Sequence, residues 1–233
     1  MYSPELSRDN AGWIEIRLPR KLLFKGIYLV FLLVFAFLPK EALSKEDHVG
    51  RLTVIDGSVT IRKTGAEKVF SASVGDNIFV GDVLNTNKGS RAQIVLTDDS
   101  SVNMSSGTAL RVNQYAFEIE NNRRTAIVKL LEGKARFVVY KQRNIGSAFR
   151  VQTGHAEITA GSADFVAVVS PEETEVVVLD GGVSVKNVLY LTVGEIRVET
   201  NQKTVVKEKI QPSEPIVITS QQRRTYGKDA HHF

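Results

Sequence analysis

The stretch Gly89–Val112, GSRAQIVLTDDSSVNMSSGTALRV, decides the fold. Its apolar residues alternate with polar ones at even-numbered positions: Ala92, Ile94, Leu96, Val102, Met104, Leu110 and Val112. This period of two is typical of β-strands with one buried face. The Asp98-Asp99 pair interrupts the pattern, and a loop of three or five residues would keep Ile94 and Val102 on the same face. The stretch therefore predicts two antiparallel strands joined by a turn at Asp98-Asp99.

Composition narrows the class of protein. The chain has 233 residues, enough for one substantial domain or two small ones. It has no cysteine, which excludes disulfides, thiolate metal sites and cysteine nucleophiles. Residues 45–200 hold 18 basic and 19 acidic residues, so the basic surplus of the chain lies at its two ends. We therefore expect no nucleic-acid partner.

The N-terminal segment has the organisation of an export signal. The apolar run GIYLVFLLVFAFL spans 26–38, is preceded by Arg17, Arg20, Lys21 and Lys25, and ends at Pro39. Ala42-Leu43-Ser44 follows with small residues at the positions that a signal peptidase reads. Residues 1–44 are predicted to be a signal peptide with a long n-region, forming a signal helix, with a mature chain that starts near Lys45. The alternative is a retained signal anchor, although a 13-residue helix spans only about 20 Å of a roughly 30 Å hydrocarbon layer.

At four further places a turn motif coincides with a change of parity, in which the apolar residues switch between even-numbered and odd-numbered positions. Val54 is even-numbered and Val59 is odd, as a two-residue turn at Asp56-Gly57 requires. The same motif occurs at Glu132-Gly133, Asp180-Gly181 and Gly194-Glu195. The predicted cross-strand pairs are Val54 with Val59, Leu130 with Ala135, Val178 with Val183, and Leu191 with Val198. Another turn is predicted within Asn121–Arg124.

These patterns predict an all-β protein whose antiparallel hairpins form a two-layer sandwich or a rolled β module. Adjacent apolar residues such as Val138 and Val139 are typical of strands that are buried on both faces. Residues 45–200 are expected to form this domain. Residues 201–233 carry six basic and three acidic residues and contain Pro212 and Pro215. They are expected to form a basic, loosely ordered tail with a possible edge strand.

The order of these segments resembles the FecR family, named for the regulator of iron-dicitrate transport. The resemblance covers roughly Val49–Thr200 and lies in VGDNIFVGDVLNT (74–86), SRAQIVLTDDS (90–100), Leu131–Val139, Ala163–Val168 and Val178–Val185. It implies a periplasmic β domain. Asp99 stands where the family usually has the glycine of an Asp-Gly-Ser turn, and aspartate tolerates positive φ better than most residues. The family's cytoplasmic sigma-factor-binding segment and its receptor-contacting C-terminal domain have no counterpart of sufficient length, so we do not expect an anti-sigma role.

Residues suited to catalysis or metal binding are few. Asp76 and Asp82 could supply carboxylates, but Gly-Asp pairs more often end strands and cap turns. Asp98-Asp99 is interpreted as a turn, and the histidines lack partners at metal-ligand spacing. We therefore expect no catalytic site, no cofactor, no metal and no enzyme activity.

The predicted function is binding or sensing of a partner in the bacterial cell envelope. The predicted binding face is the polar strand face that carries Arg91, Gln93, Asn103 and Arg111. The expected partner is an envelope protein or polysaccharide, with the domain periplasmic or secreted, or tethered to the inner membrane if the signal is retained. A structural adaptor of an envelope or secretion assembly, joined through exposed strand edges, is the alternative. A glycan-active hydrolase that uses Asp76 and Asp82 is a remote one.

Overall fold

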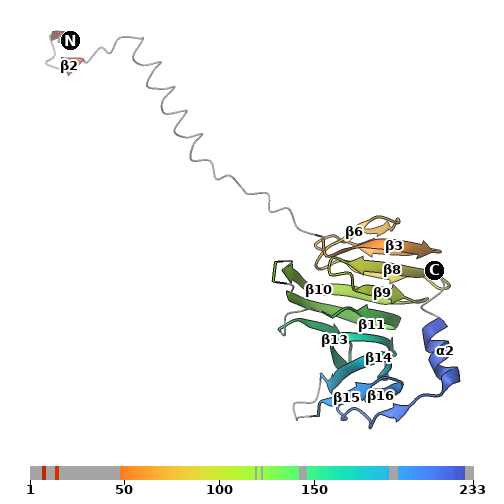
Figure 1. The fold of residues 1–233 in the computed structure, drawn as a ribbon. Helices are drawn as coiled ribbons and strands as arrows, with labels where there is room; N and C mark the ends of the chain where they lie inside the picture. Colours follow the sequence, from red (N-terminus) through yellow and green to blue (C-terminus); the bar gives the residue numbers. More distant parts are fainter. Residues whose placement is uncertain are drawn as a thin grey trace. The chain divides into compact units, whose positions relative to one another are not determined.

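A computed structural model describes residues 48–118, 120–121, 123–141, 146–188 and 194–228, together with the pairs 7–8 and 14–15 (Figure 1). The chain divides into two units, Met1–Lys45 and Glu46–Phe233. In the first unit, β1 (Ser7–Arg8) pairs with β2 (Ile14–Glu15). Apart from these two strands, the predicted signal peptide, residues 1–44, lies outside the described residues. Within the described part of the chain, no helix is long and apolar enough to cross a membrane.

The second unit is mostly β-structure, as predicted. Its strands are β3 (Gly50–Asp56), β4 (Val59–Arg62), β5 (Val69–Ser71), β6 (Asn77–Ile78), β7 (Val83–Thr86), β8 (Arg91–Leu96), β9 (Ser101–Met104), β10 (Ala109–Glu118), β11 (Arg123–Val139), β12 (Ala148–Gln152), β13 (Ala156–Val169), β14 (Glu173–Asn187), β15 (Ile196–Glu199), β16 (Gln202–Lys207) and β17 (Ile216–Val217). One helix, α2 (Ser220–Lys228), follows them. All these strands belong to one sheet, in which β11 and β12 form a parallel pair among antiparallel ones.

Three long strands fold this sheet into two layers, because the two halves of β11, β13 and β14 have different partners. One layer, the β8 layer, runs β6–β3–β8–β9, then the C-terminal halves of β11 and β13, the N-terminal half of β14, β16 and β17. The other, the β10 layer, runs β5–β4–β7–β10, then the N-terminal half of β11, β12, the N-terminal half of β13, the C-terminal half of β14 and β15. The predicted sandwich and the predicted rolled sheet are therefore both correct descriptions.

One apolar core fills the space between the layers. Phe137 of the β8 layer contacts Phe149 of the β10 layer edge to face, with ring centroids 6.2 Å apart. Phe137 also stacks on Phe165 of the neighbouring strand, at 5.2 Å. These three rings are fully buried, in a cluster that includes Leu84 and Ile94 from the two layers. Such inward apolar positions on alternate residues explain why the strands form.

The hairpin predicted at Asp98-Asp99 is confirmed. β8 and β9 pair antiparallel with Ile94 opposite Val102, and both side chains are buried. The amide of Leu96 donates to the carbonyl of Ser100 at 2.8 Å, which leaves a three-residue loop. Asp99 has φ of 65°, so it occupies the left-handed position in which the family has glycine.

The hairpins predicted at Asp56-Gly57, Glu132-Gly133 and Asp180-Gly181 are wrong. β3 pairs with β6 and β8, and β4 with β5 and β7, so the chain passes at Gly57 from one layer to the other. Gly133 and Gly181 lie inside β11 and β14, which continue through them. The predicted pairs Val54–Val59, Leu130–Ala135 and Val178–Val183 do not form. At the fourth place, Leu191 lies outside the described residues, and Val198 pairs with Val183.

A single bend changes the parity as a hairpin does. Leu130 and Ala135 are both buried on the two sides of Gly133, which has φ of 85°. Gly181, with φ of 77°, lies in the same way between buried Val178 and Val183. A left-handed glycine in a strand turns it and moves the buried face by one residue. The sequence pattern of such a bend is therefore that of a two-residue turn.

The C-terminal tail is more regular than predicted. β16 pairs with β14 and places Val206 in the core, so the sheet extends past residue 200. Ile218 packs against Val166 and Val177 on the outer face of the β8 layer, and Tyr226 of α2 joins this small apolar cluster. Val206 and Ile218 are thus buried apolar residues of the described tail. Figure 1 shows α2 beside the strands, along one side of the sheet.

Candidate binding surfaces

The turn between β8 and β9 contributes one member of the most deeply buried ion pair of the described chain. Arg124 at the start of β11 forms an ion pair with Asp98, and both side chains are fully buried. The Ser100 hydroxyl donates to Asp98 Oδ2 at 2.9 Å, and the Tyr115 hydroxyl donates to Oδ1 at 2.9 Å. The Arg124 guanidinium also lies 5.2 Å from the ring centre of Phe149. The pair joins the β8 layer to the β10 layer.

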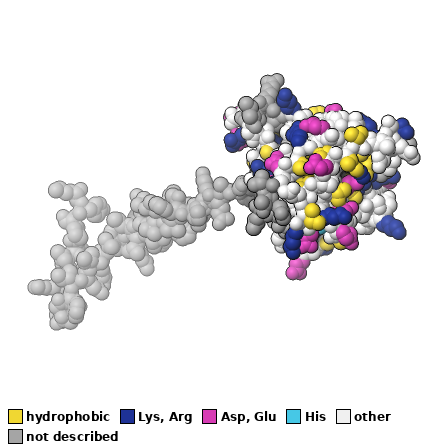
Figure 2. All heavy atoms as spheres, turned by 90° about the horizontal axis from the view of Figure 1, so that it is seen from below, with side chains coloured by type: hydrophobic (Ala, Val, Ile, Leu, Met, Phe, Trp, Pro, Cys, Tyr) yellow, Lys and Arg dark blue, Asp and Glu magenta, His cyan; other side chains and the backbone are white. Residues whose placement is uncertain are grey.

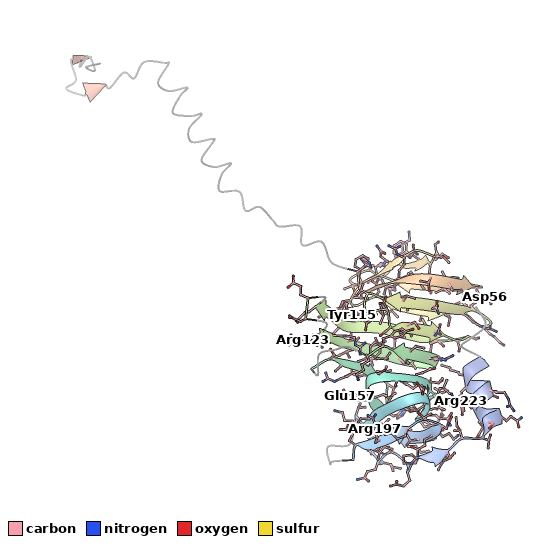
Figure 3. The ribbon with its side chains drawn as sticks, in the orientation of Figure 1. Asp56, Tyr115, Arg123, Glu157, Arg197 and Arg223 are labelled. Carbon is pink, nitrogen blue, oxygen red and sulfur yellow. The ribbon has the colours of Figure 1, made fainter. Side chains whose placement is uncertain are left out.

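Tyr115 is the most accessible member of this network. Burial raises the pKa of its hydroxyl well above its usual range, and the nearby Asp98 carboxylate acts in the same direction. Figure 3 shows Tyr115 at one end of the strands and Asp56 at the other. A hollow of about 470 Å³ lies beside Tyr115, with His48, Phe117 and Glu118 in its wall. The network is therefore buried, except that the ring of Tyr115 borders a hollow at the surface.

The aspartates considered for chemistry are bonded to the scaffold. Asp82 is buried, forms an ion pair with Lys63 at 2.7 Å, and accepts the amides of Phe79 at 3.0 Å and Thr64 at 3.3 Å. Asp76 accepts the amide of Ser73 at 2.8 Å. The interpretation that these Gly-Asp pairs cap turns is confirmed. No group of three metal-ligating side chains occurs within the described residues.

The two described histidines, His48 and His155, lie in different segments of the domain. His48 lies at the start of the described domain, and His155 is buried in the turn between β12 and β13, where its Nδ1 has no hydrogen-bond partner. His231 and His232 lie outside the described residues.

The predicted face is divided between the two layers. Arg91 and Gln93 on β8 and Asn103 on β9 share the outer face of the β8 layer, where Gln93 Nε2 donates to Asn103 Oδ1 at 2.9 Å. Arg111 lies on β10, whose partners are β7 and β11, so it faces outward from the other layer. Asn103 is also not available, because only 5% of its surface is exposed. Alternation along the chain places residues on inner or outer faces but does not say which layer a strand joins.

On the β8 layer, the polar side chains bond mainly to one another. Thr53 donates to Gln93 at 2.8 Å, and the next polar pair along the row is Arg136 with Asp164. Arg136 Nε donates to Asp164 Oδ1 at 2.7 Å and its NH2 group to Oδ2 at 2.5 Å, while its NH1 is buried without a partner. Beyond this row, α2 covers the apolar cluster: the Tyr226 hydroxyl donates to Glu175 at 2.5 Å and its ring lies 5.3 Å from Lys134 Nζ.

On the β10 layer, cations stand in a row without partners. Arg62 pairs with Val83, Val83 with Arg111, and Arg111 with Lys129, on successive strands. Among the described residues, no side-chain hydrogen bond or ion pair involves Arg62, Arg111 or Lys129. Neighbouring strands lie about 4.8 Å apart, so the three backbones lie within about 15 Å. A hollow of about 220 Å³ lies between the two arginines, with Val83 at its floor and Lys63–Glu67 and Gly81 around it. The alternation in the sequence predicted that Arg111 faces outward. It did not predict that Arg62 and Lys129 lie beside it, because that depends on the order of the strands in the sheet.

The molecular surface shown in Figure 2 mixes both signs of charge with small apolar areas. The large apolar side chains with the highest exposed fractions are Val217, Val74, Ile210, Ile216, Tyr140, Val69 and Phe70. Val69 and Phe70 belong to β5 and Ile216 and Val217 to β17, the strands at the two ends of the main path through the sheet. These ends are candidates for contact with another chain.

Comparison with known proteins gives one family. The model of the family described as "FecR protein" matches residues 82–184. Two crystal structures of a "putative anti-sigma factor" from Parabacteroides distasonis ATCC 8503, at 2.50 Å and 1.65 Å resolution, are similar to the chain at 24% sequence identity and a TM-score of 0.47. In each case the likeness covers 60% of this chain and 61% of that chain, so the chain spans about three fifths of their length. No curated protein matched.

The family match coincides with the middle of the fold. Residues 82–184 begin at Asp82, which pairs with Lys63, and include the β8–β9 hairpin and the bends at Gly133 and Gly181. They include both members of the buried Arg124–Asp98 pair. The FecR resemblance seen in the sequence is thus confirmed over this range, where residues 82–184 match the FecR family model.

Proposed function

We propose that this protein is a non-catalytic regulatory module of the bacterial cell envelope, which binds a protein partner and takes part in signalling through its FecR domain. The observation that carries the proposal is the FecR match over residues 82–184. Proteins of this family are regulators with a periplasmic β domain, as the resemblance implies. We place the β domain in the periplasm, or outside the cell, with a membrane tether if the N-terminal signal is retained.

The state of the acidic groups supports binding rather than catalysis. Asp82 and Asp98 are buried and bonded to cations, and Asp76 closes its own turn. A carboxylate that acts as general acid or base must reach a substrate. The remaining polar groups that can reach another molecule are on the outer faces of the sheet.

The β10 layer is the better candidate for the partner surface. Its outer face carries Arg62, Arg111 and Lys129 without side-chain partners in the described structure, whereas Gln93 and Asn103 on the other face bond to each other. Arginine forms planar, two-point contacts with carboxylates and is enriched in protein interfaces. Of the four residues predicted to form the binding face, we keep only Arg111. We add Arg62 and Lys129, which lie beside it on neighbouring strands. An envelope protein with acidic groups suits it, and an acidic polysaccharide is the alternative.

A complementation experiment tests the regulatory role. A strain without this gene receives the full-length wild-type chain, Arg111→Glu or Arg91→Glu, and its transcripts are sequenced. We expect a set of transcripts to change in the deletion strain and to be restored by the wild type and by Arg91→Glu but not by Arg111→Glu. If no transcript depends on the gene, the regulatory role is wrong and the structural adaptor becomes the better hypothesis.

A further inference from the structure

The strand β5 ends the β10 layer with one side open. It pairs only with β4, with Arg62 opposite Val69, Ile61 opposite Phe70 and Thr60 opposite Ser71. Within the described residues no strand lies on its other side. All three residues of β5 are exposed. An open strand of this kind presents backbone donors and acceptors to another chain.

The direction of these backbone groups follows from one hydrogen bond. The amide of Ala72 donates to the carbonyl of Val59 at 2.9 Å, so these two residues are a hydrogen-bonded pair. Bonded and non-bonded pairs alternate along an antiparallel ladder. Phe70 is therefore bonded to Ile61, whereas the amide and carbonyl groups of Val69 and Ser71 point to the open side.

The side chains of β5 differ on its two faces. Phe70 is opposite the buried Ile61 and so lies on the core side, yet 44% of its surface is exposed because no further strand covers it. Lys68 Nζ lies 5.3 Å from its ring centre. Val69, 51% exposed, lies on the outer face beside Arg62. An added strand would cover Phe70 with an inward apolar side chain and place its outward side chains next to Val69.

The charges beside this edge are mainly positive. Arg62 and Arg111 border the hollow next to it, and Lys68 precedes β5, while Glu67 is the acidic residue of the same loop. Lys63 is already paired with Asp82. A partner strand with acidic residues on its outward face would lie within about 10 Å of the Arg62 backbone, a distance that two long side chains span. A second copy of this chain would instead bring Lys68 and Arg62 close to their own equivalents.

We propose that β5 is a strand-addition site for an extended segment of a partner protein in which apolar residues alternate with acidic ones. The site rests on the proposed function, since it specifies how the partner engages the β10 layer. Main-chain hydrogen bonds to Val69 and Ser71 hold the segment, the core side of Phe70 selects apolar residues, and Arg62 selects acidic ones.

The test uses a fluorescently labelled eight-residue peptide of alternating valine and glutamate, titrated into the full-length protein by fluorescence anisotropy. Ser71→Pro removes an amide that points to the open side and leaves the bonds to β4 intact. Ser71→Ala, which keeps that amide, is its matched control. We expect the wild type and Ser71→Ala to bind equally, Ser71→Pro to bind at least tenfold more weakly with an unchanged Tm, and a valine–lysine peptide not to bind.

Several results would overturn the site. Equal binding by Ser71→Pro, equal binding of the lysine peptide, or no binding of the glutamate peptide to the wild type each contradicts it. If Ser71→Pro lowers the Tm, amide NMR of the wild type decides: the amides of Val69 and Ser71 must respond to the peptide more than that of Phe70. A wild type that sediments as a dimer, with Ser71→Pro a monomer, would assign the edge to a second copy instead. None of these results alters the transcript test of Arg111→Glu, so the two proposals can fail separately.

Discussion

The two outer faces of the sheet differ in what their polar side chains contact. On the β8 layer, Gln93 bonds to Asn103 and Arg136 to Asp164, and the C-terminal helix covers the apolar residues beyond them. On the β10 layer, Arg62 and Arg111 have no side-chain partner in the described structure. Both faces come from the same alternation of apolar and polar residues. The β10 layer has side-chain pairs of its own, Gln152 with Glu157 and Lys186 with Glu157, so the difference lies in the row of Arg62, Arg111 and Lys129 and not in the whole face.

The largest effect is expected from the ion pair that joins the two layers. Arg124→Met leaves Asp98 as an unpaired charge in the core, which typically costs about 3–5 kcal/mol. Urea denaturation followed by circular dichroism measures the loss. Arg123→Met is the matched control, because its ion pair with Glu118 is about half exposed and screened by solvent, and it should leave the stability nearly unchanged. Equal losses for the two variants would mean that the buried pair does not hold the layers together.

The bend that carries β14 from one layer to the other should be the next most sensitive place. Gly181 has φ of 77°, and a Cβ there would lie 2.7 Å from the carbonyl oxygen of Ser162. Gly181→Val is expected to cost about 1–3 kcal/mol through backbone strain, with a further loss from this contact. The same substitution at Gly161, where a Cβ meets nothing within 4 Å and φ is not positive, should have little effect on the Tm. A Tm at Gly181→Val close to that of the wild type would contradict the bend.

These bends mark the limit of the sequence analysis. Alternation correctly predicted the buried apolar residues of β8 and β9 and a loop at Asp98-Asp99 with an odd number of residues, because both are local properties. It did not predict the burial of Asn103. It misread Gly133 and Gly181 as hairpin turns, since a hairpin and a bend both need a glycine with positive φ and both change parity. Which layer a strand joins depends on pairing between residues far apart in the sequence.

In the candidate site, too, local properties were predicted correctly and long-range contacts were not. Arg111 was predicted to face outward and does, but Arg124, in a segment predicted to be a turn, is the most buried charge of the described structure. Nothing in its neighbours distinguishes it from Arg123. The open edge of β5 was likewise not predicted, because Val69–Ser71 has no long alternating pattern. Its role follows only from its place at the end of the sheet.

A smaller effect should separate the two faces directly. Arg136→Met removes two hydrogen bonds to Asp164, and its side chain is 7% exposed, so we expect a loss of about 1.5–3 kcal/mol. Arg111→Met on the other face removes no bond and should stay within about 0.5 kcal/mol of the wild type. Thermal and urea denaturation of both variants measure the contrast. A clear loss at Arg111→Met would show that this arginine is structural after all.

Capture of the partner tests most directly whether the β10 layer binds it. The full-length chain with an affinity tag is cross-linked in its native host, purified, and its partners are quantified by mass spectrometry for the wild type, Arg91→Glu and Arg111→Glu, after equal Tm values are established. We predict an envelope protein that is captured equally by the wild type and Arg91→Glu and at least tenfold less by Arg111→Glu. Capture that survives Arg111→Glu but is lost with Arg91→Glu would contradict the account and place the binding surface on the β8 layer.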